Sequence, residues 1–103
     1  MGQRETLEKI KQKLEGKIVI DEIYLFGSRA KGTYNRSSDL DIAIVSESFR
    51  DMSKTERYHY VINEVREVTG DTPVDVLCYT SSEFERGSDS FLPSIIQDEG
   101  ISV

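Results

Sequence analysis

Residues 27–41, GSRAKGTYNRSSDLD, carry the two motifs that decide how this chain folds and what it does. A Gly-Ser pair follows the apolar run Ile23–Phe26, which reads as a strand that ends in a tight turn. Ten residues further on, an Asp-x-Asp pair opens a second apolar run, Leu40–Val45. The sequence therefore predicts two strands whose ends meet at a phosphate-binding turn and a pair of carboxylates.

The Asp-x-Asp pair has the geometry of a site for hard metal ions. Side chains alternate along a strand, so Asp39 and Asp41 share one face while Leu40 points into the core. Their Cα atoms lie about 7 Å apart at 3.3–3.4 Å per residue. Carboxylate ligands suit Mg²⁺, Mn²⁺ or Ca²⁺ better than zinc. The alternative is a pair of acids that only caps a turn through Asx hydrogen bonds.

The turn after the first strand is suited to binding phosphate. Gly27 can adopt a positive φ, and its lack of a side chain lets an anion approach the backbone. A short helix is expected over 28–31, and its N-terminus would favour anions. Ser28 can donate a hydroxyl hydrogen bond, and Arg29 and Lys31 add positive charge. By itself, however, a Gly-Ser pair after a strand is usually an ordinary turn.

A third carboxylate is offered by the β-rich run 73–79, which holds Asp75 between two valines. If this strand lies beside the strand of Asp41, Asp75 joins the same cluster and could accept a proton as a general base. The alternative is an edge strand on which Asp75 faces water.

Taken together, these motifs closely resemble the DNA polymerase beta nucleotidyltransferase superfamily. The resemblance rests on Gly27 and Ser28, on Asp39 and Asp41 after the ten-residue spacer, and on the lone Asp75 of a later strand. The short length and the segments GSRAKG and SSDLDIAIV are most similar to the minimal nucleotidyltransferases. The resemblance covers nearly the whole chain, and no position within the motif departs from it.

The resemblance implies transfer of a nucleoside monophosphate, AMP from ATP, to a hydroxyl acceptor. It assigns Asp39, Asp41 and Asp75 to catalysis and to two Mg²⁺ ions. It assigns Gly27 and Ser28 to the β- and γ-phosphates, with Arg29 as an auxiliary contact. The expected fold is a small mixed α/β sheet with helices packed mainly on one face, in a single domain over residues 1–103.

Composition agrees with a small cytoplasmic enzyme. The chain has 103 residues, a formal net charge of −6 and a pI near 4.8, which disfavours a general nucleic-acid surface. Its one cysteine, Cys78, lies in an apolar run, where it is expected to be buried in a reducing compartment. We expect no signal peptide, and no apolar run of the sequence is long enough to cross a membrane.

Periodicity predicts alternating helices and strands. Ser53 and Glu56 form a capping-box signature at the start of the longest helix, and His59 on that helix is expected to be exposed. The predicted helices cover 4–15, 53–69 and 90–98, with one helical turn over 81–86, and the predicted strands cover 18–26, 39–45 and 73–79.

From its 103 residues, we expect the chain to have no second domain that closes the active site. The groove would then be completed by a partner protein or by a second copy. In the minimal nucleotidyltransferases, the resemblance implies a helical HEPN-type partner, a toxin that the transferase neutralises by adding AMP to a tyrosine. Two alternatives remain: a transferase that modifies small molecules, as aminoglycoside nucleotidyltransferases do, and a non-catalytic antitoxin that acts by binding.

Overall fold

The computed structural model describes residues 2–27, 39–86 and 92–103. Its sheet has four strands in the order β3-β2-β1-β4. β1 is antiparallel to both β2 and β4, whereas β2 and β3 are parallel, so the sheet is mixed as the sequence predicted. The strands are β1 (Glu22–Phe26), β2 (Leu40–Val45), β3 (Val74–Tyr79) and β4 (Ile101–Ser102).

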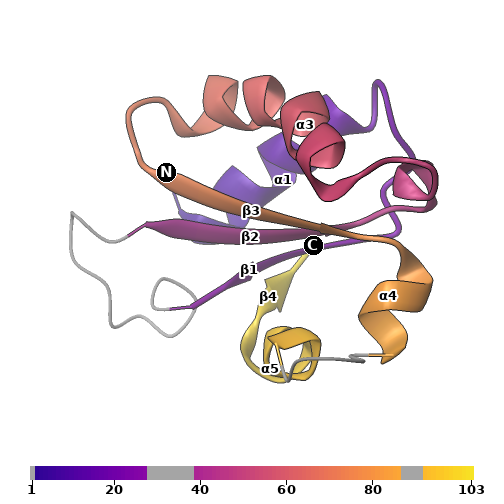
Figure 1. The fold of residues 1–103 in the computed structure, drawn as a ribbon. Helices are drawn as coiled ribbons and strands as arrows, with labels where there is room; N and C mark the ends of the chain where they lie inside the picture. Colours follow the sequence, from indigo (N-terminus) through magenta and orange to yellow (C-terminus); the bar gives the residue numbers. More distant parts are fainter. Residues whose placement is uncertain (1, 28–38, 87–91) are drawn as a thin grey trace.

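Two long helices cover one face of the sheet (Figure 1). They are α1 (Gln3–Leu14) and α3 (Lys54–Thr69), and α3 is the crossover that joins the parallel strands β2 and β3. Alternate residues of β2 point toward them, and the buried cluster on this side includes Leu40, Ile42 and Ile44. This is the larger of the two cores.

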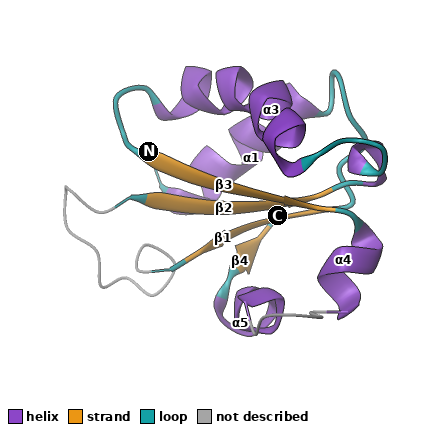
Figure 2. Cartoon of the chain, in the orientation of Figure 1, coloured by secondary structure: helices purple, strands orange, loops and turns teal. Residues whose placement is uncertain are grey.

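The opposite face carries two short helices, α4 (Ser81–Arg86) and α5 (Leu92–Glu99) (Figure 2). Here Ala43 and Val45 of β2 pack with Phe84 of α4 and Ile96 of α5. Asp41 precedes these residues in the same alternation, so its side chain belongs to this second face. The long helices thus lie on the face away from Asp41, while the two short helices share its face.

The main differences from the sequence-based prediction are the start of the first strand and two elements that were not predicted. The first strand begins at Glu22 rather than at residue 18, because the amides of Lys17 and Ile18 still bond to the Leu14 carbonyl at 2.9 Å. A 3-10 helix, η1 (Glu47–Phe49), and the two-residue strand β4 were not predicted. In the described residues the last helix begins at Leu92.

The longest helix is capped as the sequence predicted. The Ser53 hydroxyl accepts a hydrogen bond from the Glu56 amide at 3.1 Å, and the Glu56 carboxylate accepts one from the Ser53 amide at 2.9 Å. The predicted environments of two other residues are also confirmed, because His59 is exposed and Cys78 is a buried free thiol. None of the helices in the described ranges is long and apolar enough to span a bilayer.

The cap gives a direct stability prediction. We expect Ser53→Ala to lower the free energy of unfolding by about 1 kcal/mol, because the first turn of α3 loses a hydrogen-bond acceptor. Urea denaturation measures the change. Ser82→Ala is the control, since Ser82 is an exposed serine of α4, and it should leave stability nearly unchanged. Equal effects of the two substitutions would contradict the assignment.

Candidate active site

The parallel pairing of β2 and β3 brings two carboxylates side by side. The register matches Asp41 with Asp75, so the two residues are direct neighbours on adjacent strands. Both belong to the face that carries α4 and α5, at the ends where β2 and β3 begin. Asp41 is half-buried, while Asp75 is exposed on the edge strand. The sequence left two alternatives for Asp75, a place beside Asp41 and a water-facing position on an edge strand. The structure shows both at once.

Asp39 completes the group of acids, just before β2 begins. It is exposed, and it lies close enough to act electrostatically on Asp41. Burial raises the pKa of the Asp41 carboxyl above its ordinary value, and the negative charges of Asp75 and Asp39 raise it further. The charged form of Asp41 is thus disfavoured by its own surroundings.

The turn after β1 lies directly against the Asp41 carboxylate. Phe26 is paired with Asp41 in the antiparallel ladder, and Gly27 follows it with a φ of +76°. A Cβ placed on Gly27 would lie 3.2 Å from Asp41 Cγ and would overlap Asp41 Oδ2. Glycine is needed here for two reasons, its left-handed backbone and the close approach of the carboxylate.

These donors fit a divalent cation, although they are not a finished ligand set. Among the described residues, no three His, Cys, Asp or Glu side chains form a group that could hold a metal ion as they stand. The three acids nevertheless offer only oxygen donors, and the cost of charging Asp41 is one that a bound cation would relieve. We therefore treat Asp39, Asp41 and Asp75 as candidate ligands.

Most of the predicted phosphate contacts fall outside the described part of the chain. Ser28 and Arg29, together with Lys31, lie outside the described residues, so only Gly27 of that turn is placed.

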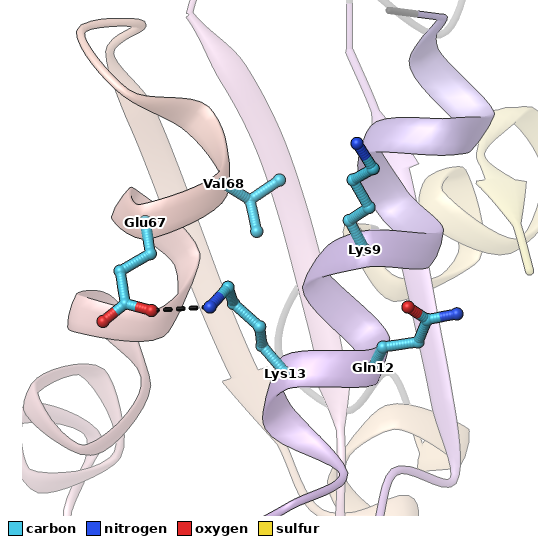
Figure 3. Close-up of a pocket in the computed structure, with 5 residues that line it drawn as sticks. All are labelled: Lys9, Gln12, Lys13, Glu67 and Val68. Carbon is cyan, nitrogen blue, oxygen red and sulfur yellow. Dashed lines mark hydrogen bonds and ion pairs between the residues drawn. The ribbon is translucent and has the colours of Figure 1, made fainter.

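The prominent hollow between α1 and α3 is not part of the acidic site (Figure 3). It lies in the layer of α1 and α3, on the face of the sheet away from Asp41. Its Lys13 and Glu67 side chains already form an ion pair of 2.7 Å.

Sequence reasoning missed a buried arginine at the other end of the sheet. Arg57 is only 4% exposed, and it pairs with Glu83 of α4 at 2.6 Å while donating to the carbonyls of Met52 and Cys78. The signal was present, because Arg57 precedes the buried residues Val61 and Val65 at four-residue spacing on α3. The contact joins α3 to α4 and occupies a backbone group of β3.

The charge environment of Asp41 predicts an unusual pH dependence. A carboxyl whose pKa is raised on folding binds more protons in the native state than in the unfolded chain. Its contribution to the free energy of unfolding therefore falls as the pH rises from the unfolded pKa through the folded one. Urea titrations from about pH 3 to about pH 7 in a chelator should show Asp41→Asn gaining stability over the unsubstituted protein as pH rises. A difference in stability between the two proteins that stays constant with pH would contradict this prediction.

Fold and site together define a small α/β domain with paired acids at the ends of neighbouring strands. The chain belongs to the nucleotidyltransferase domain family, whose profile matches residues 4–103. A comparison with curated proteins found no significant match.

Solved structures agree with this assignment. A protein from Sulfolobus solfataricus assigned as a nucleotidyltransferase is 23% identical, with a TM-score of 0.67 over 95% of this chain and 76% of that one. A toxin–antitoxin structure with AMP-PNP is 26% identical, with a TM-score of 0.66 over 92% of this chain and 69% of that one. A variant of the toxin–antitoxin MntA-HpeT with two aspartate-to-glutamate substitutions is 25% identical, with the same TM-score and coverage. The likeness to the Sulfolobus solfataricus protein concerns the fold alone.

Proposed function

We propose that this protein transfers AMP from ATP to a hydroxyl group of a toxin protein, and so acts as its antitoxin. The observation that carries the proposal is the pairing of Asp41 with Asp75, with the Gly27 backbone against the same carboxylate. Membership of the nucleotidyltransferase family supports the reaction class. The likeness to toxin–antitoxin structures, one of them with AMP-PNP, supports the nucleotide and the partner. By resemblance, the partner is a helical HEPN-type protein and the acceptor is a tyrosine.

In the proposed reaction, the acceptor oxygen attacks the α-phosphorus of ATP. The new oxygen–phosphorus bond forms as the bond from the α-phosphorus to the bridging oxygen breaks, and pyrophosphate leaves with that electron pair. Asp75 is exposed beside Asp41, so it can take the hydroxyl proton and pass it to solvent. Such transfers depend mainly on positioning and charge neutralisation.

Two divalent ions would be held by Asp39, Asp41 and Asp75, and when bound they supply positive charge to the phosphates. The chain's own contribution is to hold the acids on one face and to exclude a side chain at Gly27. A larger residue there would displace the Asp41 carboxylate. Phosphate contacts from Ser28 and Arg29 remain part of the proposal.

The test is a transfer assay with the proposed HEPN-type partner. The two proteins are co-expressed, purified and incubated with Mg²⁺ and ATP labelled at the α-phosphate, and label on the partner is measured. We expect one or more labelled residues in the partner and loss of its toxicity. A toxin that is neutralised without label would favour the non-catalytic antitoxin. Label on an aminohydroxyl compound without any partner would favour a small-molecule transferase.

A further inference from the structure

β3 forms one border of the sheet, and that border is open in the described part of the chain (Figure 2). All of β2 except Asp41 is buried, whereas only Cys78 is buried in β3. An edge strand presents backbone donors and acceptors that another strand can use.

The hydrogen bonds identify which backbone groups of β3 point outward. The Pro73 carbonyl accepts from Leu40, and the Tyr79 carbonyl accepts from Ser46, both at 2.9 Å. Because residues of a parallel strand alternate, Asp75 also directs its backbone groups toward β2. The residues between them, Val74, Val76 and Cys78, direct theirs to the open border.

One of these outward groups is already in use. The Cys78 carbonyl accepts a hydrogen bond from Arg57 Nη1 at 3.2 Å. Among the described residues, Val74 and Val76 have no comparable contact at their outward backbone groups. The available part of the edge is therefore short, and it is centred on Asp75.

This placement has a geometric consequence for a strand that binds there. An antiparallel strand bonded to Val74 and Val76 would set one residue directly opposite Asp75, in the close pair with Cα atoms about 4.5 Å apart. The side chain of that residue would point to the same face as Asp75 and Asp41. A hydroxyl on it would stand next to the candidate base.

A small hollow at the same border adds a place for a side chain. It has a volume of about 80 Å³ and is lined by Lys54 and Tyr58 of α3 together with Val76, Leu77, Cys78 and Tyr79 of β3. Because Val76 and Leu77 belong to opposite faces of the sheet, the hollow lies at the edge itself. It could hold one apolar side chain of an added strand.

Charge argues against a second copy of this chain as the occupant. If two β3 strands paired through both Val74 and Val76, each Asp75 would lie directly opposite the other. Like charges in that position are destabilising. A different sequence with a hydroxyl residue opposite Asp75 avoids this repulsion and can donate a hydrogen bond to the carboxylate.

We propose that the protein acceptor binds as an extended segment along the open edge of β3, which adds a fifth strand and brings its hydroxyl beside Asp75. This inference rests on the proposed function, and it specifies how the partner is recognised. Main-chain hydrogen bonds at Val74 and Val76 would supply affinity, and the residue opposite Asp75 would be the one modified.

The test substitution is Val76→Pro. Proline removes the outward N–H and breaks no bond to β2, so an edge strand tolerates it. Val76→Ala is the matched control, since it shortens the side chain and keeps the N–H. With the co-expressed partner as acceptor, we expect Val76→Pro to lower kcat/KM for labelling about tenfold. Val76→Ala should change it much less, and ATP affinity should be unchanged in both variants.

The outcomes separate the two proposals. Labelling by Val76→Pro at the rate of Val76→Ala would overturn edge binding while leaving the transferase function standing. No labelling by the unsubstituted protein would instead remove the proposed function. If Val76→Pro melts at a clearly lower temperature than the unsubstituted protein, its loss of activity could come from unfolding. Edge binding is then tested by amide hydrogen exchange on the unsubstituted protein.

In that measurement, the Val74 and Val76 amides should exchange more slowly once the partner is bound. The Leu77 amide, which points toward β2, serves as the reference. Unchanged exchange at Val74 and Val76 in the complex would overturn the proposal. So would protection of both amides in the isolated protein together with dimer formation, because a second copy would then occupy the edge.

Discussion

Asp41→Asn should lower AMP transfer by about a thousandfold and leave the fold intact, because a neutral amide could not replace the carboxylate that we propose as a ligand of the divalent cations. Asp41 is central among the candidate acids, since Asp75 is its direct neighbour across the strands and Asp39 adds charge to the same group. Removing the charge of Asp41 also removes its repulsion from Asp75 and Asp39. Without metal, the variant should therefore melt at the same temperature as the unsubstituted protein or higher.

Measurements of activity and melting temperature on one preparation test this prediction. Asp71→Asn is the matched control, because Asp71 is an exposed aspartate in the turn before β3 and the substitution changes net charge equally. It should retain activity. Mg²⁺ should raise the melting temperature of the unsubstituted protein more than that of Asp41→Asn. Full transfer by Asp41→Asn in saturating Mg²⁺ would exclude Asp41 as a required ligand.

Gly27→Ala should also remove most of the activity, and it should destabilise the protein. A left-handed backbone costs alanine roughly 1–2 kcal/mol relative to glycine. In addition, the new methyl group would overlap Asp41 Oδ2, so the carboxylate must move away from Asp75 or the turn must shift. Either change disturbs the site, and we expect a loss in kcat/KM of at least about a hundredfold.

Gly70→Ala separates the two causes. Gly70 follows α3 with a φ of +62°, but no atom beyond its immediate chain neighbours lies within 4 Å of the position of a Cβ there. This variant should lose stability from backbone strain and keep its transfer activity. If Gly70→Ala lost as much activity as Gly27→Ala, the effect would be one of general stability, and the contact with Asp41 would not matter.

Most of the architecture could be predicted from local patterns. The capping box fixed the start of α3, and the strand alternation placed Asp41 on the face opposite Leu40 and Ile42. The predicted start of β1 was wrong, because backbone hydrogen bonds to the end of α1 continue as far as Ile18. An apolar run does not reveal such bonds. β4 was missed because two residues carry too little pattern.

The site was harder to predict, because it depends on contacts between distant residues. Whether Asp75 would meet Asp41 depends on the register of β2 and β3, which no local pattern within either strand reveals. That Gly27 lies against the Asp41 carboxylate depends in the same way on how β1 pairs with β2. The roles of Ser28 and Arg29 stay predictions.

The crossover through α3 also bears on how the protein matures. Pairing of parallel strands that are distant in the sequence is slow, because the entropy of closing the intervening chain is lost before the contacts between the strands are gained. Asp41 and Asp75 thus become neighbours only when β2 and β3 pair. A chain in which β3 has not yet paired with β2 would lack the acidic pair, so the proposed AMP transfer would require the completed sheet.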